Sequence, residues 1–488
     1  MEMRRPRRSL RPRSWARRAS RAAVLGAILA VPVAACGQPA EPTPPPPDAR
    51  TVAAAITEEG LRSSLESLVA AAEGSDAYRA VGSAGYDRAA AMVEEVLRDA
   101  GWSVTPDAWD GIAFVDEGGS TLDVAGRTFG DADVKALIFA PAGQVEGPVV
   151  PIDWDPTATA ADGRGCAVTH YGDLPPGAIV VVRSGDCLRR DQVIAAQQAG
   201  AAAFIAVYPW APAGAVYRAT LLEPGFLTIP AAGVTGEAAE ALVAAAGAGE
   251  PARLVTRART RQVPTRSIIA ELPGSQPGAV IMLGAHLDSG LDGPGVNDDG
   301  SGVAALLEIA RALGGTRPRA TIRLAFWSGE ELGLHGSYRY ASALSKEDAL
   351  AILVYANADM IASPNGFAGV YDEPGAPAGS NVARALLTSA VERAGGTPIG
   401  VDVGGGSDHR GFADAGVATA GVFSGAGEPV TAEQAATTGA IGGRPADACY
   451  HQPCDDLANV NLGLARTLAA ALADFAVRVA SNPELLRH

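Results

Sequence analysis

Residues 279–313 read AVIMLGAHLDSGLDGPGVNDDGSGVAALLEIARAL, and this stretch decides the fold. The apolar run at 279–284 predicts a buried strand, a loop rich in Gly and Asp follows, and the apolar spacing at 303–313 predicts a helix. The same alternation continues with expected strands at 321–326 and 352–356 and an expected helix at 382–393. Strands that alternate with helices predict an α/β fold of three layers, α/β/α, around a mainly parallel mixed sheet.

Polar residues stand where the first of these strands ends. His286 and Asp288 follow it, and a double Asp, Asp298 with Asp299, stands just before the helix. A His at the end of a strand can be an ordinary core residue, but the double Asp makes this group a candidate metal site. Imidazole and carboxylate are ligands that zinc accepts in catalytic sites, and a carboxylate can bridge two cations. Asp288 is two residues after His286, so both side chains are expected on the same face of the strand, and Asp288 could orient the imidazole.

Two further acidic groups follow the next strands. Glu330 and Glu331 come after the strand at 321–326, and Asp359 comes after the strand at 352–356. Adjacent carboxylates at a helix start can be favourable partners of the helix dipole and nothing more. Alternatively, because consecutive side chains point in different directions, one can bind metal while its neighbour acts as general base toward the attacking water. A buried Asp359 needs a charged partner or a metal.

Two cysteines flank a histidine near the C-terminus. Cys449 and Cys454 are five residues apart, with Pro453 between them, and fit a small disulfide loop that fixes His451 in place. They could instead be zinc thiolates, but the other candidate ligands are oxygens and histidines. The chain has five cysteines, and an odd count in an exported protein suggests two bridges and one cysteine with another fate.

The N-terminal segment 1–35 has the pattern of a secretory signal: nine Arg, a single Glu and an apolar run that ends in small residues. The sequence VAACG at 33–37 resembles a bacterial lipobox, in which Cys36 is lipidated and tethers the protein to a membrane. The alternative is a plain secretory signal with a chance Cys. Residues 36–50 then form the lipidated Cys and a Pro-rich linker. We therefore expect an exported cell-membrane lipoprotein that faces the extracytoplasmic side.

Composition and charge exclude two other classes. Of the 488 residues, 48% are hydrophobic and 19% charged, which excludes a disordered chain. The formal net charge is −15, and the chain beyond residue 35 carries −23, with Lys only at 135 and 346. A surface this acidic excludes nucleic acid as a partner, because phosphate contacts need basic side chains.

A composition change near residue 131 indicates an inserted domain. Short β-rich runs at 136–139 and 178–182 precede an expected helix at 192–199 and an apolar run at 201–208. This segment resembles the protease-associated domain that is inserted in many exopeptidases. The resemblance implies a disulfide between Cys166 and Cys187, whereas two reduced core cysteines are the alternative. The expected domains are the first part of a peptidase domain at 51–130, the insert at 131–257 and the catalytic part at 258–488.

Five motifs resemble those of the two-zinc aminopeptidases of metallopeptidase family 28, and the likeness is greatest to secreted bacterial leucine aminopeptidases. The motifs are GAHLDS (284–289), GVNDDGSG (295–302), SGEELG (328–333), NADMI (357–361) and CYH (449–451). The resemblance covers roughly residues 60–130 and 260–475. It implies a zinc-exopeptidase domain with two Zn²⁺ per chain.

The resemblance also implies a role for each matching residue. His286 and Asp359 bind one zinc, Glu331 and His451 bind the other, and Asp298 bridges them. Glu330 is the general base, Asp288 orients His286, and Tyr450 donates a hydrogen bond to the oxyanion. A cis peptide is implied between Asp298 and Asp299.

One position departs from the family pattern. Close relatives carry an Arg just before the Ser-Asp-His of residues 407–409, where this chain has Gly406. The family pattern therefore does not define the contacts around the substrate N-terminus here. Asp408 and His409 could form another metal site, but they fit better as supports of the first. The other histidines, His170, His335 and His488, are expected to be surface or packing residues.

These features predict a monomeric zinc aminopeptidase that acts on peptides with a free N-terminus and prefers large apolar N-terminal residues. An acidic lining from Glu330 and Asp359 would attract the α-ammonium group. A carboxypeptidase or dipeptidase of the same family is the alternative, for which Arg410 could bind a terminal carboxylate. Glutaminyl cyclase is another alternative on this fold. It is disfavoured because such cyclases use one zinc, whereas the five candidate ligands here are enough for two. A binding module is disfavoured because the ligands are intact.

Overall fold

Residues 279–313 form strand β11 (Val280–His286) and helix α6 (Gly300–Leu313), as the sequence predicts. Alternate side chains of β11 lie in different hydrophobic clusters, Leu283 on one face and Met282 on the other. The strand is therefore buried on both faces, as is typical of a parallel strand in a sheet covered by helices on both sides.

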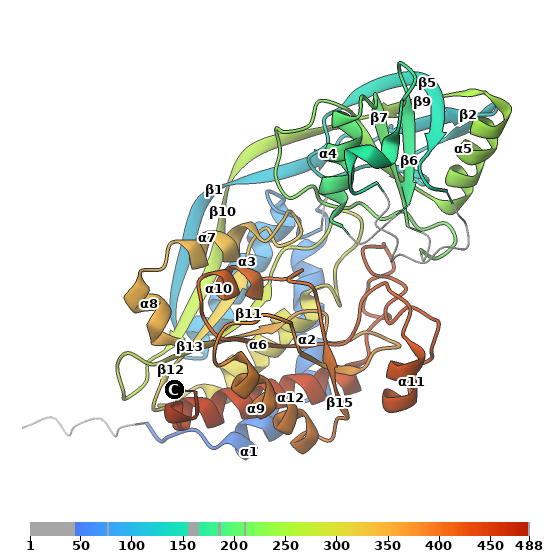
Figure 1. The fold of residues 1–488 in the computed structure, drawn as a ribbon. Coiled ribbons are helices and arrows are strands. Elements are labelled where there is room, and N and C mark those ends of the chain that lie inside the picture. The colour runs from blue at the N-terminus through green and yellow to red at the C-terminus, as the bar shows by residue number, and fades with distance from the viewer. Residues whose placement is uncertain (1–43, 76–77, 155–164, 184–186, 209–210, 487–488) are drawn as a thin grey trace, which may run out of the picture. The chain divides into compact units, whose positions relative to one another are not determined.

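The structure is a computed structural model that describes residues 44–75, 78–154, 165–183, 187–208 and 211–486 (Figure 1). The predicted signal segment, Cys36 and the linker up to residue 43 lie outside the described residues. Residues from Pro44 onward belong to one unit by their internal contacts. Among the helices of the described part, none combines the length and the apolar character needed to cross a bilayer.

The first sheet has eight strands in the order β1-β10-β12-β11-β13-β16-β14-β15. Its four central strands, β12, β11, β13 and β16, are parallel, while β10 and β14 run antiparallel to their central neighbours. The sheet is therefore mixed and mainly parallel, which confirms the predicted fold class. The strands are β1 (Ser103–Asp116), β10 (Ala258–Leu272), β12 (Thr321–Trp327), β13 (Ile352–Ala358), β14 (Ala368–Tyr371), β15 (Pro398–Val401) and β16 (Thr419–Phe423).

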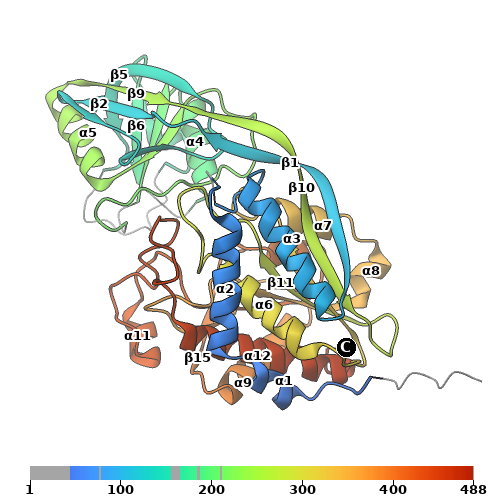
Figure 2. The ribbon, with the colours of Figure 1, turned by 180° about the vertical axis from the view of Figure 1, so that it is seen from behind.

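Helices cover both faces of this sheet. One face packs against α1 (Ala49–Ala55), α2 (Glu58–Ala72), α3 (Ala84–Asp99), α6, α9 (Ser380–Arg393) and α12 (Leu462–Ser481), whose apolar residues share the largest hydrophobic cluster (Figure 2). The other face packs against α7 (His335–Ser342), α8 (Lys346–Ala351) and α10 (His409–Asp414) around Trp327 and Phe412 (Figure 1). A short helix, α11 (Ala432–Thr438), and a 3₁₀ turn, Pro483–Leu485, complete this part.

The second sheet also has eight strands, in the order β3-β2-β9-β5-β6-β7-β8-β4. Its elements are β2 (Thr121–Val124), β3 (Arg127–Phe129), β4 (Val134–Ala136), β5 (Gly143–Pro151), a 3₁₀ turn (Val168–Tyr171), β6 (Ile179–Arg183), α4 (Arg189–Gln198), β7 (Ala203–Val207), β8 (Ala231–Val234), α5 (Gly236–Ala248) and β9 (Pro251–Thr256). The disulfide between Cys166 and Cys187 is present, as the resemblance to the protease-associated domain implied.

The boundaries of the insert stay a prediction, but two strands bear on them. β2 and β3 precede residue 131 and yet pair with β9 and with each other in the second sheet. The second sheet thus begins about ten residues before the change of composition near 131. In addition, only the first residue of the β-rich run at 136–139 lies in a strand, because β4 ends at Ala136. Phe139 has a φ of +71°, a left-handed conformation that a strand does not contain.

Candidate active site

Two groups of potential metal ligands lie at the carboxyl ends of the central strands. His286, Glu330 and Asp359 form one group, and Asp298, Glu331 and His451 form the other. Within each group the ligand atoms all lie within 4.8 Å of one another. These are the six His, Asp and Glu side chains that the sequence analysis assigned to metal binding or general-base catalysis. The structure therefore brings together residues that are up to 165 positions apart in the chain.

Asp298 belongs to the second group and also faces His286 of the first. Its Oδ1 is 3.2 Å from His286 Nε2, and its Oδ2 is 3.1 Å from His451 Nε2. Glu331 Oε2 is also 3.1 Å from His451 Nε2, and Asp359 Oδ1 is 3.6 Å from His286 Nε2. A carboxylate that turns one oxygen toward each imidazole can bridge two cations.

The second residue of the double Asp has a different task. Asp299 caps α6 by accepting the amide of Gly302 at 2.9 Å, and it also accepts the amides of His286 and Met360 at 3.1 and 3.2 Å. It thereby joins the ends of β11 and β13 to the start of α6. The peptide between Asp298 and Asp299 is cis, as the resemblance implied.

The chemistry of the donor set fits divalent zinc. Glu331 Oε1 is buried and has no hydrogen-bond partner among the described residues, which is costly for a carboxylate oxygen unless a cation satisfies it. Burial raises the pKa of Glu330 well above its ordinary value, and the charges of Asp359 and Asp408 add to the shift. Nitrogen and oxygen donors in this number are typical of catalytic zinc sites.

Asp288 supports the site differently from the sequence expectation. His286 Nδ1 lies 3.0 Å from the main-chain carbonyl oxygen of Asp288, so the backbone rather than the carboxylate is the partner of the imidazole. The carboxylate instead accepts the amides of Gly329, Glu330 and Glu331 at 2.8, 3.2 and 3.3 Å. The side chain of Asp288 therefore holds the turn that carries the two adjacent glutamates.

The Ser-Asp-His of residues 407–409 lies beside the site. Ser407 Oγ donates to Asp359 Oδ2 at 2.6 Å, while His409 Nε2 lies 2.9 Å from Glu373 Oε2. Asp408 is buried, and burial raises its pKa to about 7. Neither Asp408 nor His409 belongs to a metal-ligand group of the described residues.

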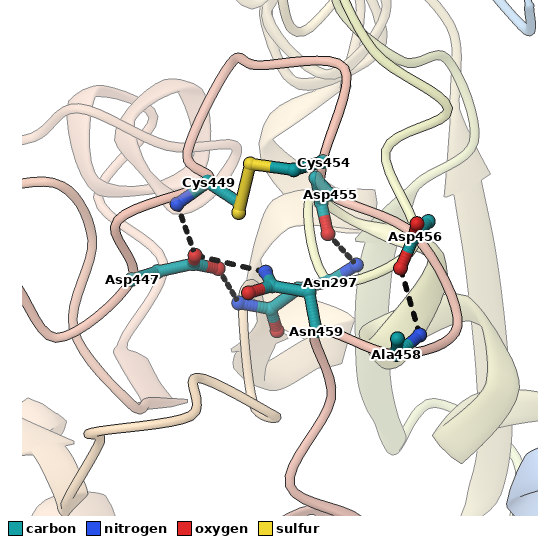
Figure 3. Close-up of a disulfide and its surroundings, with 8 residues drawn as sticks. All are labelled: Asn297, Asp447, Cys449, Cys454, Asp455, Asp456, Ala458 and Asn459. Carbon is teal, nitrogen blue, oxygen red and sulfur yellow. Dashed lines mark hydrogen bonds between the residues drawn. A yellow bond between two sulfur atoms is a disulfide. The ribbon is translucent and has the colours of Figure 1, made fainter.

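His451 lies in the loop between Cys449 and Cys454, and Figure 3 shows the disulfide that closes this loop. Cys449 and Cys454 are bonded, which confirms the pairing expected from their spacing. Asp455 accepts the amides of Asn297 and Asp298 at 2.8 and 3.1 Å, so the loop is tied to the segment that carries the bridging Asp298.

Further contacts fix the same loop. Asp447 accepts the side-chain amide of Asn297 at 2.7 Å and the main-chain amide of Cys449 at 2.8 Å (Figure 3). The ring of Tyr450 stacks on His451 with 3.9 Å between centroids.

His335, expected to be a surface or packing residue, stacks on Phe139.

Arg79 is a buried cation beside the site that no sequence motif pointed to. Arg79 lies between α2 and α3 and is fully buried. Its guanidinium donates to the carbonyls of Leu287, Pro294 and Gly295 at 3.0, 2.6 and 2.8 Å. Arg79 thus fixes both ends of the loop between His286 and Asp298 and places a positive charge beside an acidic site. No local sequence pattern marks it, because its partners are main-chain atoms more than 200 residues away.

Comparisons with known proteins agree with this geometry. The family model "Peptidase family M28" matches residues 267–476, and the "PA domain" model matches residues 145–242. The chain is 33% identical over 423 residues to the "Probable lipoprotein aminopeptidase LpqL" of Mycobacterium tuberculosis, covering 83% of this chain and 81% of that protein. An aminopeptidase of Pseudomonas aeruginosa is 32% identical, over 81% of this chain and 76% of that one. In fold, the chain resembles a zinc aminopeptidase of Bacillus subtilis, with a TM-score of 0.67 at 22% identity over 88% and 96% of the two chains.

Proposed function

The chain belongs to peptidase family M28 and is an aminopeptidase with an inserted protease-associated domain. We propose that it uses two zinc ions to hydrolyse the N-terminal peptide bond of peptides. The observation that carries the proposal is the position of Asp298 between His286 and His451. In this proposal His286 and Asp359 hold one zinc, Glu331 and His451 hold the other, and Asp298 is shared. When bound, the two cations supply Lewis acidity toward the scissile carbonyl and the attacking water.

Glu330 is the general base of the proposed reaction. It stands beside His286, with 3.9 Å between Oε2 and Nε2, and its side chain is 13% exposed. Burial raises its pKa, which strengthens the carboxylate as a proton acceptor. The carboxylate accepts the proton of the attacking water and passes it to the amine that leaves.

Tyr450 is the hydrogen-bond donor to the oxyanion in this proposal. Burial raises the pKa of Tyr450 well above its ordinary value, so the phenol keeps its proton at neutral pH and can donate it in a hydrogen bond. The stacking of its ring on His451 places the phenol beside a proposed zinc ligand. A donor in that position stabilises charge that develops on the carbonyl oxygen.

The substrate end that enters the site is the free α-amine. Glu330 and Asp359 line the site with negative charge, which attracts an ammonium group. The resemblance to leucine aminopeptidases supports a preference for large apolar N-terminal residues, and the rings of Tyr217 and Tyr450 offer an apolar wall beside His451. A carboxypeptidase would need a cation for the terminal carboxylate. Arg410, the candidate for that role, pairs instead with Asp414 at 3.1 Å.

We further propose that the enzyme is an exported lipoprotein, anchored through Cys36 and monomeric. The sequence VAACG at 33–37 supports the anchor, as does the printed name of the mycobacterial relative, which calls that protein a lipoprotein. A radiolabelled palmitate that enters the wild-type chain but not a Cys36→Ser variant would establish the anchor, and equal labelling of both would exclude it.

Two measurements test the catalytic proposal. The chain that lacks residues 1–36 should hydrolyse Leu-p-nitroanilide and leave N-acetyl-Leu-p-nitroanilide intact, because acetylation removes the cationic amine. Cleavage of both substrates would indicate an endopeptidase instead. Metal analysis of the fully loaded protein should give close to two zinc per chain, and a value of one or none would exclude the two-metal mechanism.

A further inference from the structure

A short segment of the inserted domain contacts three loops of the peptidase domain. This segment, residues 216–222, lies between β7 and β8 of the second sheet. We call it the bracing segment. Each of the three loops that it contacts carries a proposed ligand of the metal group Asp298, Glu331 and His451.

The first contact is ionic. Arg218 Nε lies 2.9 Å from Asp292 Oδ2, and Lys135 Nζ of the insert lies 2.7 Å from Asp292 Oδ1. The side chains of Arg218 and Asp292 are only 4% and 12% exposed, so the pair is little screened by water. Asp292 lies in the loop from β11 to α6, six residues before Asp298. Arg218 and Lys135 therefore fix the loop that leads to the bridging carboxylate.

The second contact involves the turn of the adjacent glutamates. Thr220 Oγ1 donates to the carbonyl of Leu332 at 2.9 Å, and Leu332 directly follows Glu331. Next to it, His335 Nε2 lies 2.8 Å from the carbonyl oxygen of Leu222. The bracing segment thus contacts the main chain on the C-terminal side of Glu331, while Asp288 holds the amides on its N-terminal side.

The third contact involves the disulfide loop. The side-chain amide Nε2 of Gln452 donates to the carbonyl of Val216 at 3.2 Å. The rings of Tyr217 and Tyr450 lie with 6.0 Å between centroids. Tyr450 and Gln452 are the two neighbours of His451 in the chain, so the bracing segment contacts this ligand's loop on both sides.

The other metal group is held by the peptidase domain itself. His286 is the last residue of β11, which pairs with β12 and β13. Asp359 follows β13 and accepts the hydroxyl of Ser407. We propose that the bracing segment is a positioning element for one metal group, Asp298, Glu331 and His451, so that zinc affinity there depends on the inserted domain. This inference rests on the proposed two-zinc function.

The test is a zinc titration of metal-free protein, with zinc chloride as the probe and calorimetry or a competing chromophoric chelator as the readout. Arg218→Met removes the ion pair between the bracing segment and Asp292 while Lys135 keeps its own contact with Asp292, and Thr220→Val removes one hydroxyl with little change of shape. Thr220→Ser keeps the hydroxyl. Arg253→Met breaks an exposed ion pair with Asp123 inside the second sheet and serves as the control for loss of an arginine elsewhere in the insert.

We expect Arg218→Met and Thr220→Val to weaken one of the two zinc affinities by about tenfold or more, the usual size of an effect on groups that orient ligands. The other zinc affinity, which shares only Asp298 with the braced group, should fall much less. Thr220→Ser and Arg253→Met should bind zinc like the wild type. If Arg218→Met does not fold, the two Thr220 variants decide the question alone.

Two results would overturn the inference while the proposed function stands. In one, the wild-type chain binds two zinc ions, and Arg218→Met and Thr220→Val bind both ions with wild-type affinity. In the other, the variants weaken both affinities equally. A wild-type chain that takes up one zinc or none would overturn the proposed function and this inference together.

Discussion

The main-chain amide of Glu330 donates a hydrogen bond to Asp288 Oδ1 at 3.2 Å, in a turn where the same carboxylate also accepts the amides of Gly329 and Glu331. Asp288 is fully buried, so water cannot replace these bonds. The proposed general base and its neighbouring ligand are thus held by a residue two positions beyond His286 in the chain. The turn therefore depends on a side chain whose two oxygens both accept hydrogen bonds.

Asp288→Asn should disturb this turn. One carboxylate oxygen becomes an NH₂ group that faces an amide N–H, and an unsatisfied buried donor costs about 1–3 kcal/mol. We expect kcat for Leu-p-nitroanilide to fall about 10–100-fold, with little change in KM. Asp131→Asn is the matched control, because Asp131 also accepts two loop amides, at 2.8 Å each, but in the second domain. Wild-type kcat in Asp288→Asn would show that the carboxylate is dispensable.

Glu330→Gln should separate metal binding from proton transfer. The amide keeps the size of the side chain but cannot accept the proton of the attacking water, so turnover should fall about 10²–10⁴-fold while zinc content stays near that of the wild type. Glu331→Gln should do the opposite and lose zinc first. Steady-state kinetics and metal analysis of the two variants test this contrast. Near wild-type turnover in Glu330→Gln would exclude Glu330 as the base.

The sequence predicted the metal-ligand groups because their residues stand at strand ends in recognisable motifs. Parallel strands bring His286, Glu330 and Asp359 to the same edge of the sheet, so order along the chain implies proximity in space. His451 follows no strand, and only its place between two cysteines and its likeness to the family pointed to it.

The supporting contacts could not be predicted in this way. Arg79 and Asp455 bind main-chain groups of distant loops, and a main-chain partner leaves no trace in residue type. Strand β1 was not predicted from the sequence for another reason. It contains Pro106 and Gly111, which usually mark turns, but β1 is an edge strand of its sheet, where proline is tolerated.

The two disulfides should differ in what their loss affects. Cys449 and Cys454 close a loop of only five residues, and Cys166 and Cys187 a loop of 21, so the chain-entropy model gives about 2 and about 3 kcal/mol of stabilisation. The short loop, however, holds His451 at a φ of +53°. Cys449→Ser with Cys454→Ser should therefore lower zinc affinity and kcat, measured by titration and kinetics. Cys166→Ser with Cys187→Ser should lower the unfolding free energy and leave kcat unchanged. The reverse pattern would contradict the assignment.

The ion pair between Arg218 and Asp292 should make stability depend on pH in acid. Burial raises the pKa of Asp292, but Arg218 and Lys135 together outweigh burial and lower it below its ordinary value. The unfolded chain then binds the proton first, at an ordinary Asp pKa of about 3.9. The stabilisation is complete above that pH and is lost as the pH falls below it.

Urea unfolding of the wild type and of Asp292→Asn at several pH values measures this effect. The variant should be less stable by about 1–3 kcal/mol at pH 6, because Arg218 and Lys135 lose a buried charged partner, and the gap should narrow below about pH 4. Asp123→Asn, which breaks the exposed pair with Arg253, should cost about 0–1 kcal/mol at pH 6. A gap that stays constant down to pH 3 would mean that Asp292 is not held ionised by its two cationic partners.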